Sequence, residues 1–137
     1  MRIIAGEWRG RKLVAPPGDL TRPTADRTRE TLFNMLASRV GSFEGLSVLD
    51  LFAGSGALGL EALSRGAASC LFVEQDAQAV KAIRTNIDAL DARSRCVVQQ
   101  ASVMSLGPAK APHDLILLDP PYETGAGYVA LERLTRL

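Results

Sequence analysis

The stretch LSVLDLFAGSGALG, residues 46–59, decides the fold of this chain. It begins as an apolar run, turns at Gly54 and Gly56, and continues past Gly59 into a second apolar run that Gly66 stops. An apolar strand, a glycine-rich turn and a helix in this order form the first unit of an open α/β sheet. The glycines at 54, 56 and 59 also satisfy the G-x-G-x-x-G pattern with which such turns bind dinucleotides.

Strands and helices alternate along the rest of the chain. Short apolar runs predict strands, and apolar positions at steps of three and four predict helices. We expect strands at 46–51, 70–74, 96–99 and 115–118, and helices at 57–65, around 80–90 and from Tyr128 onward. Such alternation is typical of a parallel sheet covered on both faces. We therefore predict a Rossmann-like, doubly wound α/β fold. If its strand order is 3-2-1-4, the first strand neighbours the fourth at the point where ligands bind. Because a bare sheet edge favours aggregation, we also expect two or three more strands beyond this chain.

The N-terminal part has a different pattern, and we predict a separate unit over residues 1–42, followed by the sheet domain over 43–137. Residues 2–6 and 11–14 are expected to form a β-hairpin around the Trp8–Gly10 turn. A helix is expected from Thr24 to Val40. One face of this helix carries Leu32, Phe33, Leu36 and Val40, and Arg27 and Arg29 point outward. Residues 1–39 carry eight Lys and Arg against four acids, whereas residues 46–137 carry eight against ten. This asymmetry predicts a local anion-binding surface at the N-terminal end.

Composition excludes several classes of protein. With 137 residues, 47% of them hydrophobic and 23% charged, the chain has the profile of one globular domain. It has neither an apolar run of about 18 residues nor a secretory signal, so we expect a cytoplasmic protein without membrane spans. Cys70 and Cys96 lie inside apolar runs and are expected to be buried reduced thiols. His113 has no ligand neighbours at metal-binding spacing, so we expect no metal site.

Asp50 and Glu74 end the first two predicted strands and indicate the cofactor. A carboxylate beside the glycine-rich turn would repel the pyrophosphate of a nicotinamide cofactor, whereas the ammonium and sulfonium of S-adenosylmethionine are cations. Glu74 can accept both ribose hydroxyls of either cofactor. The sequence therefore favours S-adenosylmethionine, with a nicotinamide cofactor as the alternative. The candidate cofactor residues are Asp50, Phe52, Gly54, Gly56, Gly59, Glu74, Ala101 and Ser102, the last two following the third strand.

The tetrapeptide Asp119-Pro120-Pro121-Tyr122 follows the fourth predicted strand. Two prolines favour a rigid, extended loop that offers carbonyl acceptors and lacks two N–H donors. The Asp119 carboxylate and the Pro120 carbonyl can together accept the two N–H bonds of an exocyclic amine, while Tyr122 stacks on the ring that bears it. These four residues are the predicted catalytic residues. The alternative is a purely structural role, in which the loop is a rigid turn and Tyr122 packs against the fold.

The motifs resemble a known family. Asp119 to Tyr122 is similar to the Asn/Asp-Pro-Pro-Tyr/Phe signature of amino-methyltransferases, and residues 50–62 are similar to the cofactor turn of Rossmann-like S-adenosylmethionine enzymes. Further N-terminal motifs resemble the 16S ribosomal RNA guanine-N2 methyltransferases of the RsmD family: residues 2–6, 9–13, Arg22-Pro23-Thr24, 26–30 and 32–34. The resemblance covers essentially the whole chain.

The resemblance implies methyl transfer from S-adenosylmethionine to N2 of a guanine in 16S ribosomal RNA, in a small subunit or an assembly intermediate. Guanine N2 lies in the minor groove of a duplex, so an exposed or flipped nucleotide is needed. The resemblance also implies that phosphates are bound by Arg9, Arg11, Lys12, Arg22, Arg27 and Arg29. Trp8 either stacks on a base or packs the hairpin, and we expect the enzyme to be a monomer.

Three other functions stay open at this point. A DNA adenine or cytosine amino-methyltransferase would use the same Pro-Pro loop. A nicotinamide-dependent oxidoreductase would use the glycine turn and Glu74, although no hydride-transfer partner such as a Tyr-x-x-x-Lys pair is evident. A module that only binds RNA would retain the fold without its chemistry.

Overall fold

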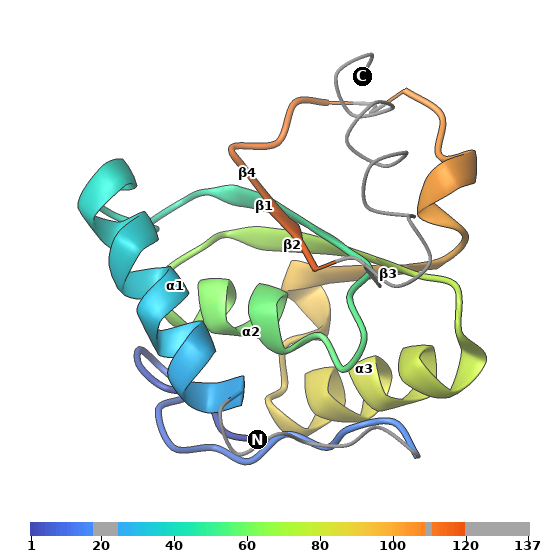
Figure 1. The fold of residues 1–137 in the computed structure, drawn as a ribbon, viewed down its shortest axis with the longest axis horizontal. Helices are drawn as coiled ribbons and strands as arrows, with labels where there is room; N and C mark the ends of the chain where they lie inside the picture. Colours follow the sequence, from blue (N-terminus) through green and yellow to red (C-terminus); the bar gives the residue numbers. More distant parts are fainter. Residues whose placement is uncertain (18–24, 109–110, 120–137) are drawn as a thin grey trace.

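The computed structural model describes residues 1–17, 25–108 and 111–119 (Figure 1). Its centre is the predicted parallel sheet, which has four strands in the order β3-β2-β1-β4. This is the order in which the first strand neighbours the fourth. The strands are β1 (Ser47–Leu51), β2 (Ser69–Glu74), β3 (Cys96–Gln100) and β4 (Leu115–Leu118). This order puts β1 between β2 and β4, so the glycine-rich turn leaves the sheet from a central strand.

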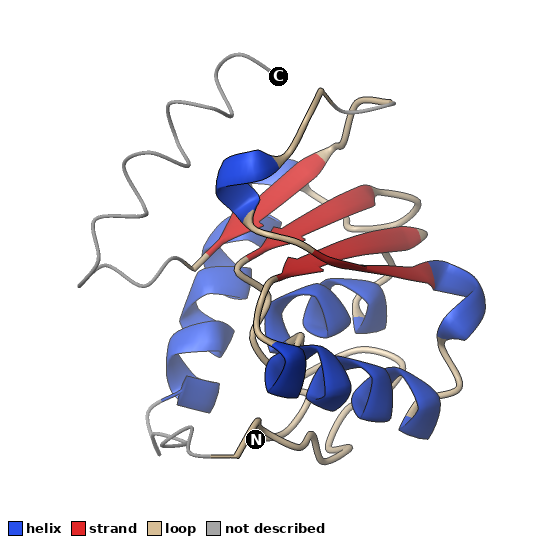
Figure 2. Ribbon diagram, turned by 90° about the vertical axis from the view of Figure 1, so that its right-hand side faces the viewer, coloured by secondary structure: helices blue, strands red, loops and turns tan. Residues whose placement is uncertain are grey.

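Three α-helices lie together on one side of the sheet (Figures 1 and 2). They are α1 (Ala25–Val40), α2 (Ala57–Ser64) and α3 (Ala77–Ala89), and two 3-10 turns, η1 (Arg93–Arg95) and η2 (Val103–Ser105), flank β3. Asp76 begins α3 by accepting a hydrogen bond from the backbone N–H of Ala79 at 2.9 Å. Gly66 follows the C-cap of α2 with φ +127°, a backbone conformation that favours glycine.

The main core lies between these helices and the sheet, with Phe33, Leu60 and Phe72 among its fully buried side chains. The opposite face carries a smaller cluster of Leu49, Leu51, Val73 and Val103, to which η2 contributes. On the described part of the chain no α-helix covers that second face, where Val97 is 63% and Ile116 46% exposed. The helix predicted from Tyr128 lies outside the described residues. Within the described ranges, no helix has the length and apolar content needed to cross a bilayer.

The N-terminal segment reverses direction as predicted but does not form two strands. Only an isolated antiparallel bridge joins Arg2 and Lys12, with a hydrogen bond from the Ile3 N–H to the Arg11 carbonyl at 2.9 Å. The antiparallel hairpin pairing is therefore observed, but the two expected strands are not, because the backbone donors of Ile4 and Ala5 bind a side chain of α2 instead of a neighbouring strand.

That side chain is Glu61, which is fully buried. Its Oε1 accepts from the Ile4 N–H at 2.9 Å and from Arg29 Nε at 3.2 Å; its Oε2 accepts from the Ala5 N–H at 3.1 Å and from Arg65 Nε at 2.9 Å. A buried charge is tolerated only when its lone pairs are satisfied in this way. Glu61 therefore joins the N-terminal segment and α1 to α2.

Arg29 requires a correction. We expected it to point outward and to bind phosphate, but its side chain is only 4% exposed. Besides Glu61, its guanidinium binds Asp26 Oδ1 at 3.1 Å and the backbone carbonyl of Arg2. Arg27, two residues earlier, is exposed as predicted. The buried negative charge of Glu61 explains the difference, because it requires a buried cation beside it.

Trp8 and Val40 also differ in their surroundings. Trp8 is 7% exposed and packs in the main core, with the guanidinium carbon of Arg95 5.1 Å from its ring centroid. Of its two expected roles, packing is the one observed. Val40, expected on the buried face of α1, is 42% exposed at the end of the helix. Because Ile3, Trp8 and Leu13 share one core with the sheet, the proposed boundary after residue 42 stays a prediction.

We expect Glu61→Gln to lower the free energy of unfolding by about 3 to 5 kcal/mol, because it removes the buried partner of Arg29, leaving only the partly exposed Asp26 as its counter-charge, and presents N–H groups to other donors. Urea unfolding followed by circular dichroism measures this change. Asp88→Asn is the control, since it removes an acid from the exposed Asp88–Arg93 pair and should change stability little. Equal effects of the two substitutions would contradict the structural role of Glu61.

Candidate cofactor site

The carboxyl ends of three strands meet at one edge of the sheet. Leu51 of β1 is in register with Val73 of β2 and with Leu118 of β4, so the residues that follow these strands are neighbours. Asp50, Glu74 and Asp119 come together there, and the charges of Asp119 and Glu74 both raise the pKa of Asp50. In open α/β sheets this edge is where ligands bind.

Asp50 is fully buried beneath α2. Its Oδ2 accepts a hydrogen bond from the Gly59 N–H at 3.0 Å, whereas its Oδ1 has no partner among the described residues. The N-cap residue of α2 is Gly56, which has no side chain, so Asp50 caps the helix from the neighbouring strand. Loss of solvation raises its pKa well above the ordinary range, and the hydrogen bond from Gly59 offsets this only in part.

The glycine-rich turn has an open side and a packed side. Phe52, Gly54 and Gly56 all have positive φ, at 56°, 59° and 82°, and the first is unusual for a residue with a side chain. A Cβ added at Gly54 would meet no atom within 4 Å, so a ligand can approach the backbone there. Residues held in such sparsely populated conformations cluster at ligand sites.

Gly59 belongs to the packed side, which corrects its place among the cofactor residues. A Cβ at this position would lie 2.5 Å from Phe72 Cε1 and 2.6 Å from Cys70 Sγ. Its backbone N–H is already bound by Asp50. Gly59 therefore allows α2 to pack closely on β2, the role that the third glycine has in dinucleotide-binding turns.

Glu74 holds the turn in shape. Its Oε1 accepts from the Gly54 N–H at 2.9 Å, and its Oε2 accepts from the Asp76 N–H at 2.8 Å. Each carboxylate oxygen has a second lone pair, so binding of ribose hydroxyls stays a compatible prediction. At the end of β3, the Ala101 N–H binds the Glu74 carbonyl at 3.1 Å, and Ser102 Oγ accepts from the Met104 N–H at 3.2 Å. Ala101 and Ser102 therefore border the site.

The remaining predicted residues are distributed differently. Asp119 is exposed directly after β4, whereas Pro120, Pro121, Tyr122 and Arg22 lie outside the described residues. Arg9, Arg11 and Lys12 are exposed, and Arg11 also donates to the Ala89 carbonyl at the end of α3 at 2.7 Å. Their exposure is compatible with RNA binding, which stays a prediction for these three residues.

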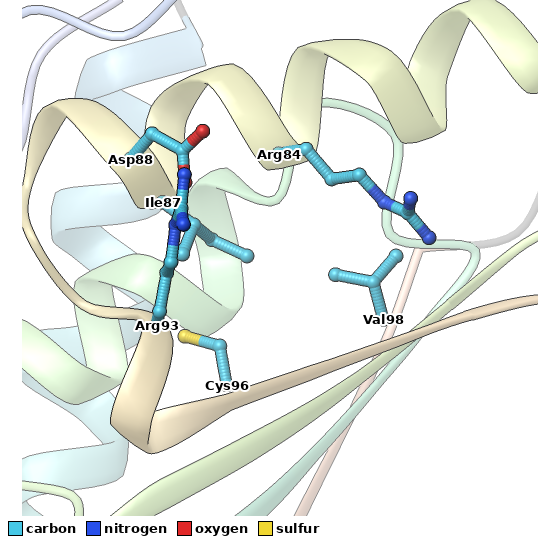
Figure 3. A pocket seen from close by; sticks show the side chains of 6 residues that line it. All are labelled: Arg84, Ile87, Asp88, Arg93, Cys96 and Val98. Atoms are coloured by element: carbon cyan, nitrogen blue, oxygen red, sulfur yellow. The ribbon is translucent and has the colours of Figure 1, made fainter.

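A hollow of about 300 Å³ lies between α3 and β3. Figure 3 shows the side chains that line it. Its lining residues are Arg84, Ile87, Asp88, Arg93, Cys96 and Val98, none of which we predicted as a site residue. Cys96 and the buried Cys70 are both free cysteines. Burial raises the pKa of Cys96 to about 11, so Cys96 is a thiol at neutral pH. This hollow is separate from the carboxylate edge.

The chemistry of the edge favours a cation. Three acids gather there, one buried carboxylate oxygen lacks a partner, and no described residue forms an ion pair with any of the three. The described residues also contain no cluster of three or more side chains that could hold a metal ion. A pyrophosphate would meet repulsion at this edge, whereas an ammonium or sulfonium would be stabilised.

Residues 1–136 match the family described as Conserved hypothetical protein 95. The chain belongs to this family. It is also 45% identical over 125 residues to the Ribosomal RNA small subunit methyltransferase D of Escherichia coli K12, over 91% of this chain and 62% of that protein. The protein of the same name from Haemophilus influenzae is 42% identical over 142 residues, 98% of this chain and 70% of the relative.

A solved structure described as "Putative methyltransferase yhhF from Escherichia coli" has a TM-score of 0.83 and 40% identity over 98% of this chain and 71% of that one. The family and the Rossmann-like fold expected from the motifs are thus confirmed. The chain spans 62% of the length of the Escherichia coli relative that it matches.

Sequence analysis missed two buried polar residues near the site. Glu61 is a lone charge within the apolar helix ALGLEALS, and Asn86 lies between Ile83 and Ile87 on the buried face of α3. A polar residue on an apolar helix face indicates a specific buried partner. That signal is present in the sequence, although the partners themselves are not.

We expect Asp50→Asn to change how stability depends on pH. The folded-state pKa of Asp50 lies above its unfolded value of about 3.9, so the wild-type protein loses stability as pH rises from that value through the folded-state pKa. Asparagine keeps the acceptor for Gly59 and carries no charge. The stability of the variant relative to wild type should therefore increase from pH 4 to pH 8 in urea unfolding. If the difference in unfolding free energy between the variant and the wild type is constant across this range, burial of the Asp50 charge does not destabilise the protein.

Proposed function

We propose that this chain is the N-terminal and cofactor-binding part of an enzyme that transfers a methyl group from S-adenosylmethionine to the N2 amine of a guanine in 16S ribosomal RNA. The proposal rests on one observation above the others: the unpartnered Oδ1 of buried Asp50, beside Glu74 and Asp119. The names of the family relatives support the reaction class, and the small-subunit context comes from them.

The described residues fit the cofactor. Asp50 would hold a cationic group through Oδ1 while its Oδ2 continues to cap α2. Glu74 would accept the ribose hydroxyls, and the open side of Gly54 would admit the ligand to the backbone. Ala101 and Ser102 would border the adenine. S-adenosylmethionine, when bound, supplies an electrophilic methyl group on a positively charged sulfur.

Asp119 and the residues after it would hold the acceptor. The Asp119 carboxylate and the Pro120 carbonyl would each accept one N–H of the guanine amine, which turns its lone pair toward the methyl donor, and Tyr122 would stack on the base. Because the methyl group would leave a positively charged sulfur, which departs as the neutral thioether of S-adenosylhomocysteine, no strong base is needed before the displacement. The methylated amine would then release its extra proton to solvent. The edge position of Asp119 beside β1 supports this assignment.

Exposed basic residues would bind the phosphates of the RNA, namely Arg9, Arg11, Lys12 and Arg27, with Arg22 as a further candidate from the sequence. Arg29 is withdrawn from this set because it is buried against Glu61. We place the reaction in the cytoplasm, on a small subunit or its assembly intermediate.

Calorimetric titration distinguishes the two cofactor classes. Wild-type protein should bind S-adenosylmethionine saturably and NADH weakly or not at all, and Asp50→Asn should weaken S-adenosylmethionine binding by at least about tenfold, or about 1.4 kcal/mol, because it removes the charge that faces the cation. Asp88→Asn, which changes an exposed acid near the end of α3 away from the edge, is the control. Tighter binding of NADH would reverse the assignment of the cofactor.

Methyl incorporation tests the acceptor. Small ribosomal subunits that lack the modification should gain N2-methylguanosine when labelled S-adenosylmethionine is supplied, and duplex DNA should gain no label. Asp119→Ala should reduce the rate about 10²- to 10³-fold with little change in cofactor affinity, because Asp119 orients the amine and not the cofactor. A variant with normal turnover and weakened cofactor binding would overturn the role of Asp119, and label in DNA alone would favour the DNA enzymes.

A further inference from the structure

One buried side chain joins the N-terminal segment to the glycine-rich turn. Asn86 of α3 is 2% exposed. Its Oδ1 accepts from the Val14 N–H at 2.8 Å, and its Nδ2 donates to the Val14 carbonyl at 3.0 Å and to the Ser55 carbonyl at 2.9 Å. The amide therefore binds both backbone groups of Val14 and uses its remaining donor on the turn.

The two ends of this bridge belong to two different binding regions. Val14 follows the exposed Arg11 and Lys12 by two or three positions, in the segment that we propose binds RNA. Ser55 lies between Gly54 and Gly56, and Gly54 is held by Glu74. The side-chain amide of Asn86 thus connects the segment that contains Lys12 to the glycine-rich turn by hydrogen bonds. We propose that Asn86 is a positioning residue that couples RNA binding to cofactor binding.

The coupling has a simple physical basis. The Asn86 side chain and its bond to Ser55 are buried, and the two bonds to Val14 are partly buried. A buried amide that loses one partner leaves an unsatisfied polar group. Displacement of the Val14 backbone would therefore release Asn86 from its place under Ser55, and displacement of the turn would loosen Val14. A ligand that orders either segment lowers the cost of ordering the other, so the two ligands bind with positive cooperativity.

A second contact between the same regions is weaker. The Ser55 hydroxyl lies 3.7 Å from the sulfur of Met1, and a thioether is a poor acceptor. The N-terminal segment has other anchors that do not touch the turn. Ser64 Oγ donates to the Ala5 carbonyl at 2.7 Å and accepts from the Trp8 N–H at 3.0 Å. Ser64 therefore provides a matched control that loosens the segment without contacting the cofactor site.

The coupling is measured as a ratio of affinities. Binding of labelled S-adenosylhomocysteine, which cannot donate a methyl group, is determined with and without small ribosomal subunits that lack the modification. This test rests on the proposed function. We expect the subunits to tighten wild-type binding at least about fivefold. The ratio should fall to about one in Asn86→Ala and in Asn86→Asp, which retains the acceptor for Val14 but loses both donors. It should persist in Ser64→Ala.

A measurement on the wild-type protein guards against variants that fail to fold. Addition of S-adenosylhomocysteine should slow hydrogen exchange of the Val14 amide several-fold, with little change at the Trp8 amide, which Ser64 holds. Unchanged exchange at Val14, or a ratio that survives in both Asn86 variants, would overturn the coupling. Failure of the wild-type protein to bind S-adenosylhomocysteine at all would instead overturn the proposed function, and the coupling with it.

Discussion

Glu61 carries a negative charge into the apolar space between α2 and the N-terminal segment, where water cannot solvate it. Two backbone N–H groups and two arginines compensate that charge, and they come from three separate parts of the chain. Because a half-compensated buried carboxylate is strongly unfavourable, these parts assemble together or not at all. The irregular N-terminal backbone follows from this constraint, since its donors are used by Glu61 and Ser64.

The position of α2 then determines the cofactor edge. Gly59 lets the helix approach Phe72 and Cys70 so closely that no side chain fits between them. This approach brings the helix N-terminus over β1, where Asp50 replaces the side chain that Gly56 lacks. The Asp50 carboxylate is thereby buried. Its Oδ2 accepts a hydrogen bond from α2, and its Oδ1 has no hydrogen-bond partner among the described residues. The turn that precedes the helix is held open by Glu74 on one side and by Asn86 on the other.

Asp50 illustrates a conflict between stability and binding. Burial raises its pKa, so the charged form is costly in the free protein. A cationic ligand reduces that cost and favours the same charged form. Residues with strongly shifted pKa values in clefts are frequent at functional sites for this reason. The proposed cation site therefore has a cost to the free fold, as does the strained backbone at Phe52.

The parallel sheet, the glycine-rich turn and the acids at the strand ends could be predicted from the sequence, because they depend on local periodicity and on short, ordered motifs. The strand order depends on how the strands pair in the folded chain. The sequence also determined the family, since the motifs are contiguous. Only the tertiary structure decided that Arg29 is buried, that Gly59 packs against the sheet, and that Asp50 caps a helix. Each of these facts depends on a partner at least nine residues away, such as Glu61 for Arg29 or Gly59 for Asp50. Local patterns reveal that such a side chain needs a partner, whereas the partner is selected by the packing of distant segments.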